Sequence, residues 1–382
     1  MVQSSIFSRQ RYPSIWPAKR VHIIEHGSFT FRKKEGEAMR FVFAIITLVK
    51  GGAQRMLVEI MEGLARRGHD VSVVMPASGI IDFPLSVRVL RTPNDEISES
   101  DIPHADVLVS NFYTTVGPVQ AASERGKGAH VRLSLCYEPL FLPNQAVSFP
   151  SYQVTPNLVV LSKYQQELVY LNHGIEPKRI PIGVSGVFRP LGLRQGEARP
   201  QIGAVIRRPD GGDAWHRQQE QLVAELVFVK ANRPEAELHL IGPPRDIQTS
   251  PVLMQMMTSG QFRFHMPEND EELCRLYNRL HIFAASSVHE ACPFPPLEAM
   301  KCGTAVAAVY SGGNMDYCRH EYNCLLSYGY ERRLGANILR LIDDLPLRER
   351  LAAAGMKEAE KWTWERSVLM FEQAACEYMG RV

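Results

Sequence analysis

Short apolar stretches alternate with helix-like segments from about residue 40 almost to the end of the chain, and this alternation constrains the fold more than any other feature. Residues 41–48 form an apolar run that ends before Gly51 and Gly52, as expected for a buried strand. The next segment carries apolar side chains at three- and four-residue spacing, which indicates an amphipathic helix. Its apolar positions are Met56, Leu57, Ile60, Met61 and Leu64. Repeated units of this kind predict parallel sheets that helices cover on both faces.

The same pattern continues on both sides of a segment rich in proline and glycine, residues 190–200. The expected strands are residues 71–75, 87–90, 107–110, 130–135 and 158–161 before this linker, and residues 202–206, 237–241, 261–266, 282–285 and 305–309 after it. The expected helices include residues 116–124, 218–231, 271–280, 296–301 and a mostly helical tail, 334–379. Two doubly wound α/β domains in series are thus predicted, with ligands beyond the carboxyl ends of the strands, in the cleft between the domains.

Composition excludes several classes of protein. The 382 residues are 45% hydrophobic, which is enough for two domain cores. Lys and Arg number 43 against 41 Asp and Glu, and this balance argues against a dedicated nucleic-acid binder. The longest strongly apolar run, residues 41–49, is far shorter than the roughly 20 residues of a membrane span, and the basic first residues lack the apolar core of a signal peptide. We therefore expect a cytoplasmic protein whose seven cysteines stay reduced.

The most informative stretch is residues 286–303, which leads from the end of an expected strand into an expected helix. Pro296 suits a first helical turn, and Glu298 is then expected in that turn, beside free backbone N–H groups that also suit a nucleotide phosphate. A carboxylate there can accept two hydrogen bonds from a ribose diol. Glu290 lies eight positions earlier, on the loop expected to form the cleft wall. From the charges alone, a Glu298 that merely supports its helix and a solvated Glu290 remain open alternatives.

This stretch resembles the Glu-x7-Glu motif of retaining GT-B glycosyltransferases, in particular glycosyltransferase family 4. The resemblance continues through the Glu-Ala-Met-x-x-Gly sequence at residues 298–303 to the Gly-Gly pair at 312–313 and the Asn-x-Leu-Leu sequence at 323–326. Residues 51–55, Gly-Gly-Ala-Gln-Arg, resemble the loop after the family's first strand, although they also suit an ordinary strand-to-helix turn. Residues 182–190 resemble the family's interdomain segment. Together these matches cover roughly residues 40–378.

The chain is expected to have four parts, of which the resemblance implies the last three. Residues 1–38 show no clear periodicity and are expected to form a flexible N-terminal extension. A basic docking tail is the alternative interpretation of this segment. Residues 39–190 form the acceptor-side domain and residues 191–362 the nucleotide-sugar-binding domain. Residues 363–382 form a helix that packs back on the N-terminal domain, because the sequence Trp-Thr-Trp-Glu at 362–365 resembles the start of the family's crossing helix.

The resemblance also implies a site for a nucleotide-diphosphate sugar, without a metal or other cofactor. Glu290 is expected to bind the donor sugar and Glu298 the ribose. The expected donor-binding residues are Glu298, Arg207, Arg217, Phe294, Pro295, Leu297 and Gly313, and the expected catalytic residues are Glu290, Arg208 and Glu138. Gly51 and Gly52 are expected to form the acceptor or phosphate loop.

The chain departs from the family pattern at two places. The family's Arg and Lys that neutralise the diphosphate have no clear Lys counterpart here: Arg207 and Arg208 are followed by His216 and Arg217, either of which is a candidate replacement. Arg grips phosphate with a planar fork, unlike Lys. Three prolines at positions 293, 295 and 296 also replace the family's glycine-rich loop and remove backbone donors.

On the N-terminal side, residues 136–141 carry Cys-Tyr-Glu-Pro-Leu-Phe where many relatives have a sugar-binding His. The segment resembles one in rhamnosyltransferases of cell-surface glycans. Glu138 is therefore a candidate for sugar or acceptor contacts, with a purely structural carboxylate as the alternative.

The predicted function is a retaining hexosyltransferase that moves a sugar to a glycan, lipid-linked or small-molecule acceptor. The sequence is compatible with peripheral contact at the inner face of the membrane. It does not specify the nucleotide base or the oligomeric state. Two alternatives stand beside it: a nucleotide-sugar-binding subunit without turnover, and another GT-B enzyme such as a sugar-nucleotide epimerase.

Overall fold

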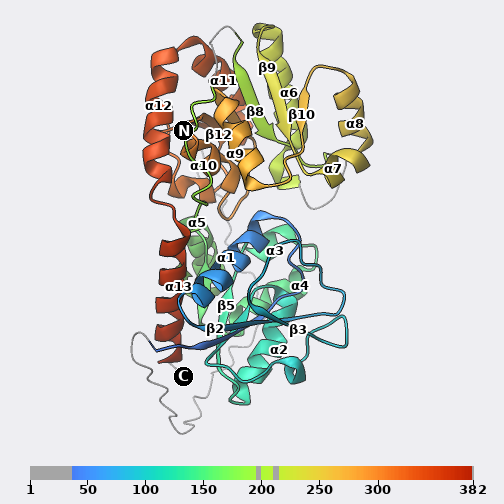
Figure 1. The fold of residues 1–382 in the computed structure, drawn as a ribbon, viewed down its shortest axis with the longest axis vertical. Coiled ribbons are helices and arrows are strands. Elements are labelled where there is room, and N and C mark those ends of the chain that lie inside the picture. The colour runs from blue at the N-terminus through green and yellow to red at the C-terminus, as the bar shows by residue number, and fades with distance from the viewer. Residues whose placement is uncertain (1–36, 195–198, 210–214, 381–382) are drawn as a thin grey trace, which may run out of the picture.

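The computed structural model describes residues 37–194, 199–209 and 215–380 of the chain. Residues 1–36, which make up most of the expected extension, and residues 195–198 of the expected linker lie outside the described part. Figure 1 shows two α/β bodies arranged end to end, with a helical C-terminal segment running along one side of both.

The N-terminal body is built on a seven-stranded sheet in the order β3-β2-β1-β4-β5-β6-β7, with every pair parallel. Its strands are β1 (Arg40–Ala44), β2 (Asp70–Met75), β3 (Arg88–Arg91), β4 (Val107–Ser110), β5 (Ala129–Leu133), β6 (Leu158–Val160) and β7 (Lys178–Arg179). The longer helices are α1 (Gly52–Arg66), α2 (Tyr113–Glu124) and α5 (Lys163–His173), and two short ones, α3 (Glu138–Phe141) and α4 (Gln145–Ser148), follow β5. In α1 the apolar positions expected from the sequence are all buried, so the amphipathic pattern identifies its core face.

The C-terminal body has a six-stranded sheet in the order β10-β9-β8-β11-β12-β13, again with every pair parallel. Its strands are β8 (Gln201–Val205), β9 (Glu237–Ile241), β10 (Arg263–His265), β11 (Ile282–Ala285), β12 (Ala305–Val309) and β13 (Leu325–Ser327). Helices α9 (Asp270–Arg279) and α10 (Phe294–Lys301) pack together, whereas α6 (Gln219–Asn232) packs against α11 (Leu334–Asp343). Helices α7 (Pro244–Thr249), α8 (Pro251–Thr258) and α12 (Leu345–Ala359) complete this body. The predicted α/β architecture with two parallel sheets is confirmed.

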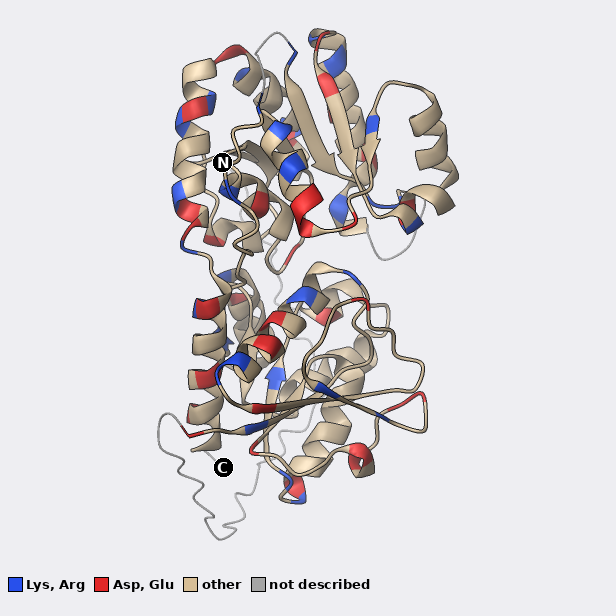
Figure 2. Cartoon of the chain, in the orientation of Figure 1, with Lys and Arg blue, Asp and Glu red and all other residues tan. Residues whose placement is uncertain are grey.

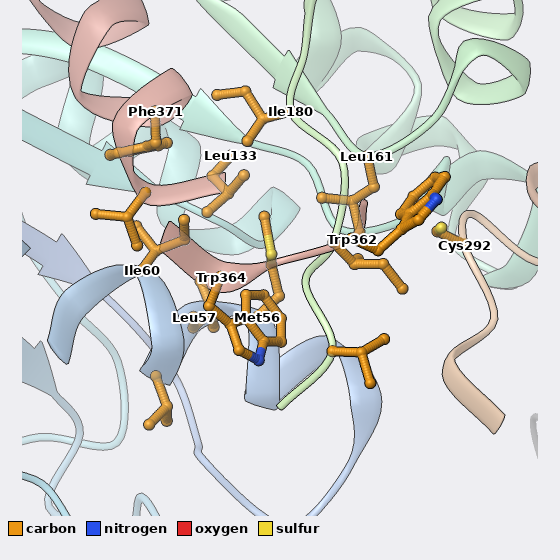
Figure 3. Close-up of a cluster of buried hydrophobic side chains, with 14 of the residues drawn as sticks. Met56, Leu57, Ile60, Leu133, Leu161, Ile180, Cys292, Trp362, Trp364 and Phe371 are labelled. Atoms are coloured by element: carbon orange, nitrogen blue, oxygen red, sulfur yellow. The ribbon is translucent and has the colours of Figure 1, made fainter. Parts of the chain in front are cut away.

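The last helix, α13 (Trp364–Met379), returns to the N-terminal body and packs against α1. Thr363 caps its N-terminus by accepting a hydrogen bond from the Arg366 N–H. Ser367 donates a 2.7 Å hydrogen bond to the Pro181 carbonyl, and the Tyr378 hydroxyl donates a 2.8 Å bond to the Leu158 carbonyl. Figure 3 shows Trp364 and Phe371 among Leu57, Ile60 and Leu133, which places side chains from both ends of the chain in one apolar cluster.

Several elements differ from the sequence-based expectations. The tail is divided into three helices, because Asp344 and the segment 360–363 interrupt it. Helix α5 and strands β7 and β13 were not predicted. No helix within the described ranges is long and apolar enough to cross a membrane.

Candidate active site

The carboxyl ends of the two parallel sheets face each other, and charged side chains join them. Arg55 at the start of α1 forms a 2.7 Å ion pair with Asp270 at the start of α9. The Lys50 ammonium donates a 2.9 Å hydrogen bond to the Glu268 carbonyl. In Figure 2 the acidic start of α9 lies on the side of the C-terminal domain that faces the N-terminal domain, whose α1 carries both basic and acidic positions. The loops expected to carry chemistry therefore lie where the two domains meet.

Glu290 lies on the loop after β11, and four contacts fix its position. Its carboxylate lies 3.4 Å from the Arg217 guanidinium and 3.8 Å from Nε2 of His216, and it accepts a 3.2 Å hydrogen bond from the Ser287 hydroxyl. Its backbone N–H donates to the Ser311 carbonyl at 2.8 Å. The side chain keeps 17% exposure, so a ligand can still reach it.

A small cavity in the C-terminal wall brings three of the expected site residues together: Glu290, Arg217 and Pro295. Serine and amide groups from neighbouring loops complete its polar lining, including Ser286, Ser287, Ser311, Gln219 and Asn314. A carboxylate, a cation and several neutral hydrogen-bonding groups around one small space suit a polyhydroxylated ligand with an attached anionic group.

Gly312 and Gly313 make this geometry possible by close backbone approach. A Cβ on Gly313 would lie 1.9 Å from the Ala291 carbonyl oxygen. The backbone N–H of Gly313 donates a 3.0 Å hydrogen bond to the Glu290 carbonyl. Gly312 has φ +82° and lies against the Tyr164 ring. The Gly-Gly pair therefore joins the loops after β11 and β12, and Gly313 acts on the site through the backbone of Glu290.

Glu298 lies in the second turn of α10, and the expectation that it belongs to the first turn is wrong. The helix begins at Phe294, so Pro295 and Pro296 both occupy the first turn and remove two of its N–H donors. The N-terminus of α10 is thus a poor phosphate site.

The Glu298 carboxylate accepts a 3.1 Å hydrogen bond from the buried Tyr277 hydroxyl. Burial, with a smaller contribution from the negative charge of Asp270, raises the pKa of Glu298 to about 7. The carboxyl group therefore changes its charge near neutral pH.

The expected cations occupy different positions. Arg217 faces Glu290 in the cavity, whereas the Arg207 guanidinium forms a 2.5 Å ion pair with Asp246 on α7. Arg208 is exposed on the loop after β8. Among these three side chains, Arg217 is the one that lines the cavity with Glu290.

Gly51 and Gly52 lie at the N-terminus of α1, opposite α10. A Cβ on Gly52 would come within 2.9 Å of the Phe294 ring, so the missing side chain lets the two helix starts approach. The first turn of α1 has no acidic residue. Its N–H groups and positive dipole end therefore remain suited to an anion.

Two of the expected donor-binding side chains serve packing instead. Leu297 is fully buried in the hydrophobic core, so its side chain is not available to a ligand. Phe294 packs against Gly52 and lies 5.9 Å from the Trp364 ring, between centroids.

Glu138 lies inside the N-terminal domain, with 2% exposure, and its placement favours the structural alternative. The carboxylate forms an ion pair with the fully buried Arg132 and accepts a 3.1 Å hydrogen bond from the Tyr113 N–H. Arg132 also stacks 3.8 Å from the Tyr152 ring. Burial raises the pKa of Glu138 to about 7, although the Arg132 charge opposes this rise.

Sequence reasoning missed two aromatic contacts that join the domains. The Tyr164 hydroxyl of α5 lies 3.2 Å from Nδ1 of His289, and the Phe141 ring packs edge-on against His216 at 5.1 Å. His289 and His216 stand next to Glu290 and Arg217 in the sequence, but nothing in the sequence identifies their partners on the other domain.

Comparison with known proteins agrees with this architecture. Residues 214–358 match the family model described as glycosyl transferases group 1. The D-inositol 3-phosphate glycosyltransferase of Salinispora arenicola is 28% identical over 188 residues, which cover 47% of this chain and 41% of that protein. The corresponding protein of Catenulispora acidiphila is 24% identical over 312 residues, covering 73% of this chain and 72% of that protein. The match with the Salinispora protein thus spans less than half of that relative's length.

Solved structures share the fold over nearly their whole length. Sucrose-phosphate synthase from Thermosynechococcus elongatus has a TM-score of 0.71 at 19% identity, covering 88% of this chain and 98% of that one. Anabaena Alr3699/HepE in complex with UDP and glucose has a TM-score of 0.69 at 18% identity, with the same coverage. The chain therefore has the two-domain GT-B fold of these structures, and its residues 214–358 match the family model of glycosyl transferases group 1.

Proposed function

We propose that the chain is a retaining glycosyltransferase that uses a nucleotide-diphosphate sugar. The observation that carries this proposal is the joint placement of Glu290 and Arg217 in one cavity, at strand ends that face the N-terminus of α1. A carboxylate beside a cation suits a sugar whose leaving group is a diphosphate. Anabaena Alr3699/HepE, which shares the fold, has been solved in complex with UDP-glucose, and this supports the same class of donor here.

In this proposal the donor lies along the C-terminal wall. Glu298, when ionised, accepts hydrogen bonds from the ribose, and Glu290 contacts the transferred sugar. Arg217 and the N–H groups at the start of α1 face the diphosphate, with Arg207 and Arg208 as further cations on the loop after β8. Negative charge grows on the departing diphosphate in the transition state, so cations fixed there before the reaction lower its barrier.

The transfer breaks the bond between the sugar's anomeric carbon and the diphosphate oxygen. The acceptor hydroxyl forms the new bond on the same face, and its proton passes to the departing diphosphate. Retention by this front-side route needs no protein nucleophile. We further propose that it needs no metal, because Arg217 and the α1 N-terminus supply positive charge.

The acceptor class remains a hydroxyl-bearing glycan, lipid-linked or small molecule that approaches from the N-terminal domain. The names of the relatives contain D-inositol 3-phosphate, which adds small phosphorylated polyols to the acceptors worth testing. We propose a cytoplasmic location, with peripheral contact at the inner membrane face if the acceptor is lipid-linked.

A thermal-shift panel of UDP, GDP, dTDP and ADP and their sugars tests donor binding. We expect one base to raise the melting temperature of the wild type in a saturable way, and Glu298→Ala to lose that shift. Glu349→Ala, on the exposed face of α12, is the matched control that keeps it. No shift with any nucleotide would overturn the proposal.

Product analysis with and without acceptor separates the alternatives. A transferase releases nucleotide diphosphate and forms a glycoside, whereas an epimerase changes the sugar nucleotide without acceptor. A binding subunit shows the thermal shift but neither transfer nor slow donor hydrolysis.

A further inference from the structure

A second cavity of about 450 Å³ lies in the C-terminal domain, beside the small cavity that holds Glu290. Three tyrosines line it: Tyr310 directly follows β12, and Tyr328 and Tyr330 follow β13. The Tyr328 and Tyr330 rings are nearly parallel, at 11° and 5.5 Å between centroids, and Tyr310 lies 5.2 Å from Tyr328. Tyr328 is 49% exposed and Tyr330 is 83% exposed. The wall is thus a row of aromatic rings that solvent reaches.

Such a row suits a carbohydrate. One face of a pyranose ring carries C–H groups, and these pack against the electron-rich face of an aromatic ring. The sugar hydroxyls around the edge need planar donors and acceptors beside the rings. An oligosaccharide exposes several such faces, one on each sugar. It therefore matches a series of tyrosine rings better than a monosaccharide does.

The remaining lining supplies those polar groups. Gln221 donates a 2.6 Å hydrogen bond from its amide nitrogen to Glu225, whose other oxygen accepts from the Gly335 N–H at 2.8 Å. The Gln221 amide is therefore held in one orientation, and its carbonyl oxygen can accept from a hydroxyl. Gln218 at the start of α6 adds a second amide to the lining.

Two arginines stand at the end of the cavity formed by the loop after β13. The side chains of Arg332 and Arg333 are exposed and form no ion pair with any residue that the structure describes. Two adjacent cations without a carboxylate partner in that part of the chain suit a carboxylate or phosphate on the ligand.

Backbone conformation singles out the same cavity. Among the described residues other than glycine, three have positive φ: Gln218, Arg332 and Glu321. The first two both line this cavity. Left-handed backbone disfavours residues with a Cβ, and such conformations concentrate where ligands bind.

The cavity is continuous with the proposed donor site but lies away from the nucleotide end. It shares Ser286 and Val309 with the cavity that contains Glu290, and His289, which precedes Glu290, forms part of its wall. Glu298, which the proposed function assigns to the ribose, belongs to the α9 and α10 side of the sheet. The tyrosine cavity belongs to the side of α6 and α11, so it is placed beyond the sugar rather than around the base.

We propose that this cavity binds a distal oligosaccharide segment of the acceptor, at least two sugars long, with an anionic group facing Arg332 and Arg333, while the reacting hydroxyl approaches from the N-terminal domain. The identification of the ligand as an acceptor rests on the proposed function. The expectation that the cavity binds an acidic oligosaccharide is argued independently, from the tyrosines, amides and arginines that line it. It makes an extended, acidic glycan the substrate class, in place of a single small polyol.

The test is binding of the full chain to an array of neutral and uronic-acid oligosaccharides of two to six sugars. We expect the wild type to bind an acidic member, and the double variant Tyr328→Ala/Tyr330→Ala to bind it at least tenfold more weakly. Tyr322→Ala, with a 56% exposed ring outside the cavity, is the control that keeps binding. Arg332→Gln/Arg333→Gln should weaken binding of the acidic glycan severalfold and leave a neutral analogue unchanged.

Absence of binding to every member of the array would overturn the proposal, as would equal binding by the double tyrosine variant. The thermal shift with nucleotide is measured on the same samples, and we expect the tyrosine variants to keep it. Loss of nucleotide binding by the wild type would overturn the proposed function, whereas loss of glycan binding alone would overturn only the cavity assignment.

Discussion

The strand ends of the two domains face each other as two walls, and these walls use their carboxylates in opposite ways. After β5 in the N-terminal domain, Glu138 turns inward and neutralises the buried Arg132. After β11 in the C-terminal domain, Glu290 stays at a cavity, where Arg217 and Ser287 hold it. Two acidic residues at equivalent ends of parallel strands thus have different surroundings. The contrast supports the proposal that the donor binds the C-terminal wall, with the N-terminal wall contributing shape and the start of α1.

Removing the buried carboxylate has the largest expected effect. Glu138→Ala leaves the Arg132 charge buried without its partner, which should cost about 3–5 kcal/mol of unfolding free energy. Urea denaturation measures this. The double variant Arg132→Met/Glu138→Leu should recover most of the loss, and a double variant as unstable as the single one would contradict the ion-pair explanation.

Changing the cavity carboxylate should affect turnover and leave stability almost unchanged. Glu290→Gln removes the charge facing Arg217, and we expect kcat to fall about 10²–10³-fold, as for loss of one preorganised electrostatic group. Nucleotide-diphosphate release from the donor identified by the thermal-shift panel measures it. Unchanged turnover in a folded Glu290→Gln variant would remove Glu290 from the donor-sugar role.

The approach of the two walls depends on a missing side chain at Gly52. In Gly52→Val the new Cβ would press on the Phe294 ring and displace the α1 start from α10. A displacement near 1 Å can lower kcat by up to about a hundredfold. Gly52→Val/Phe294→Ala should restore part of the rate, because it removes the ring that the valine meets. No rescue would indicate that the valine acts on a ligand directly.

Glu298 should give nucleotide binding a pH dependence. Because the pKa of Glu298 is about 7, its side chain is mainly ionised above neutral pH. Only the ionised carboxylate can accept hydrogen bonds from both hydroxyls of a ribose diol. Affinity for the nucleotide should rise by about tenfold in total from pH 6 to pH 8, and Glu298→Gln should flatten this difference. Titration calorimetry at both pH values measures it, and identical profiles for the wild type and the variant would contradict the ribose assignment.

The same group affects stability in the opposite sense. Between the ordinary pKa of 4.5 and the raised value of about 7, the folded chain holds a proton that the unfolded chain has released. The contribution of Glu298 to stability is therefore lost as pH rises through this window, and Glu298→Gln should reduce that slope. An unchanged slope would show that Glu298 titrates normally in the fold.

The smallest effect is expected from the ion pair that bridges the walls. Arg55 and Asp270 are 26% and 29% exposed, so their coupling should be about 0.5–1 kcal/mol and should weaken with salt. A double-mutant cycle with Arg55→Ala and Asp270→Ala measures it. A coupling of several kcal/mol would contradict this prediction and would mean that the pair holds the two domains together.

Local patterns in the sequence predict much of the fold. The spacing from Met56 to Leu64 places α1, and the apolar runs at 107–110 and 305–309 coincide with β4 and β12. The start of α10 could not be predicted as well, because Pro296 is a good first-turn residue and so is Pro295, and Phe294 gives no signal of its own. Strand β13 is only three residues long and depends on β12 for its pairing.

The site was less predictable, because its partners are far apart in the sequence. Arg207 meets Asp246, Arg55 meets Asp270, and Tyr164 meets His289, and no local pattern pairs these residues. The resemblance to a known motif selected Glu290 and Glu298. It could not show that Glu138 is turned inward, because burial is a property of the packed domain.

Hydrogen–deuterium exchange with and without the bound nucleotide sugar tests most directly which wall carries the donor. We predict slower exchange in peptides covering residues 286–294 and 215–219, with a smaller change at 50–55 and none at 134–141. Protection confined to residues 134–141, with the C-terminal loops unchanged, would contradict the assignment of donor chemistry to the C-terminal wall.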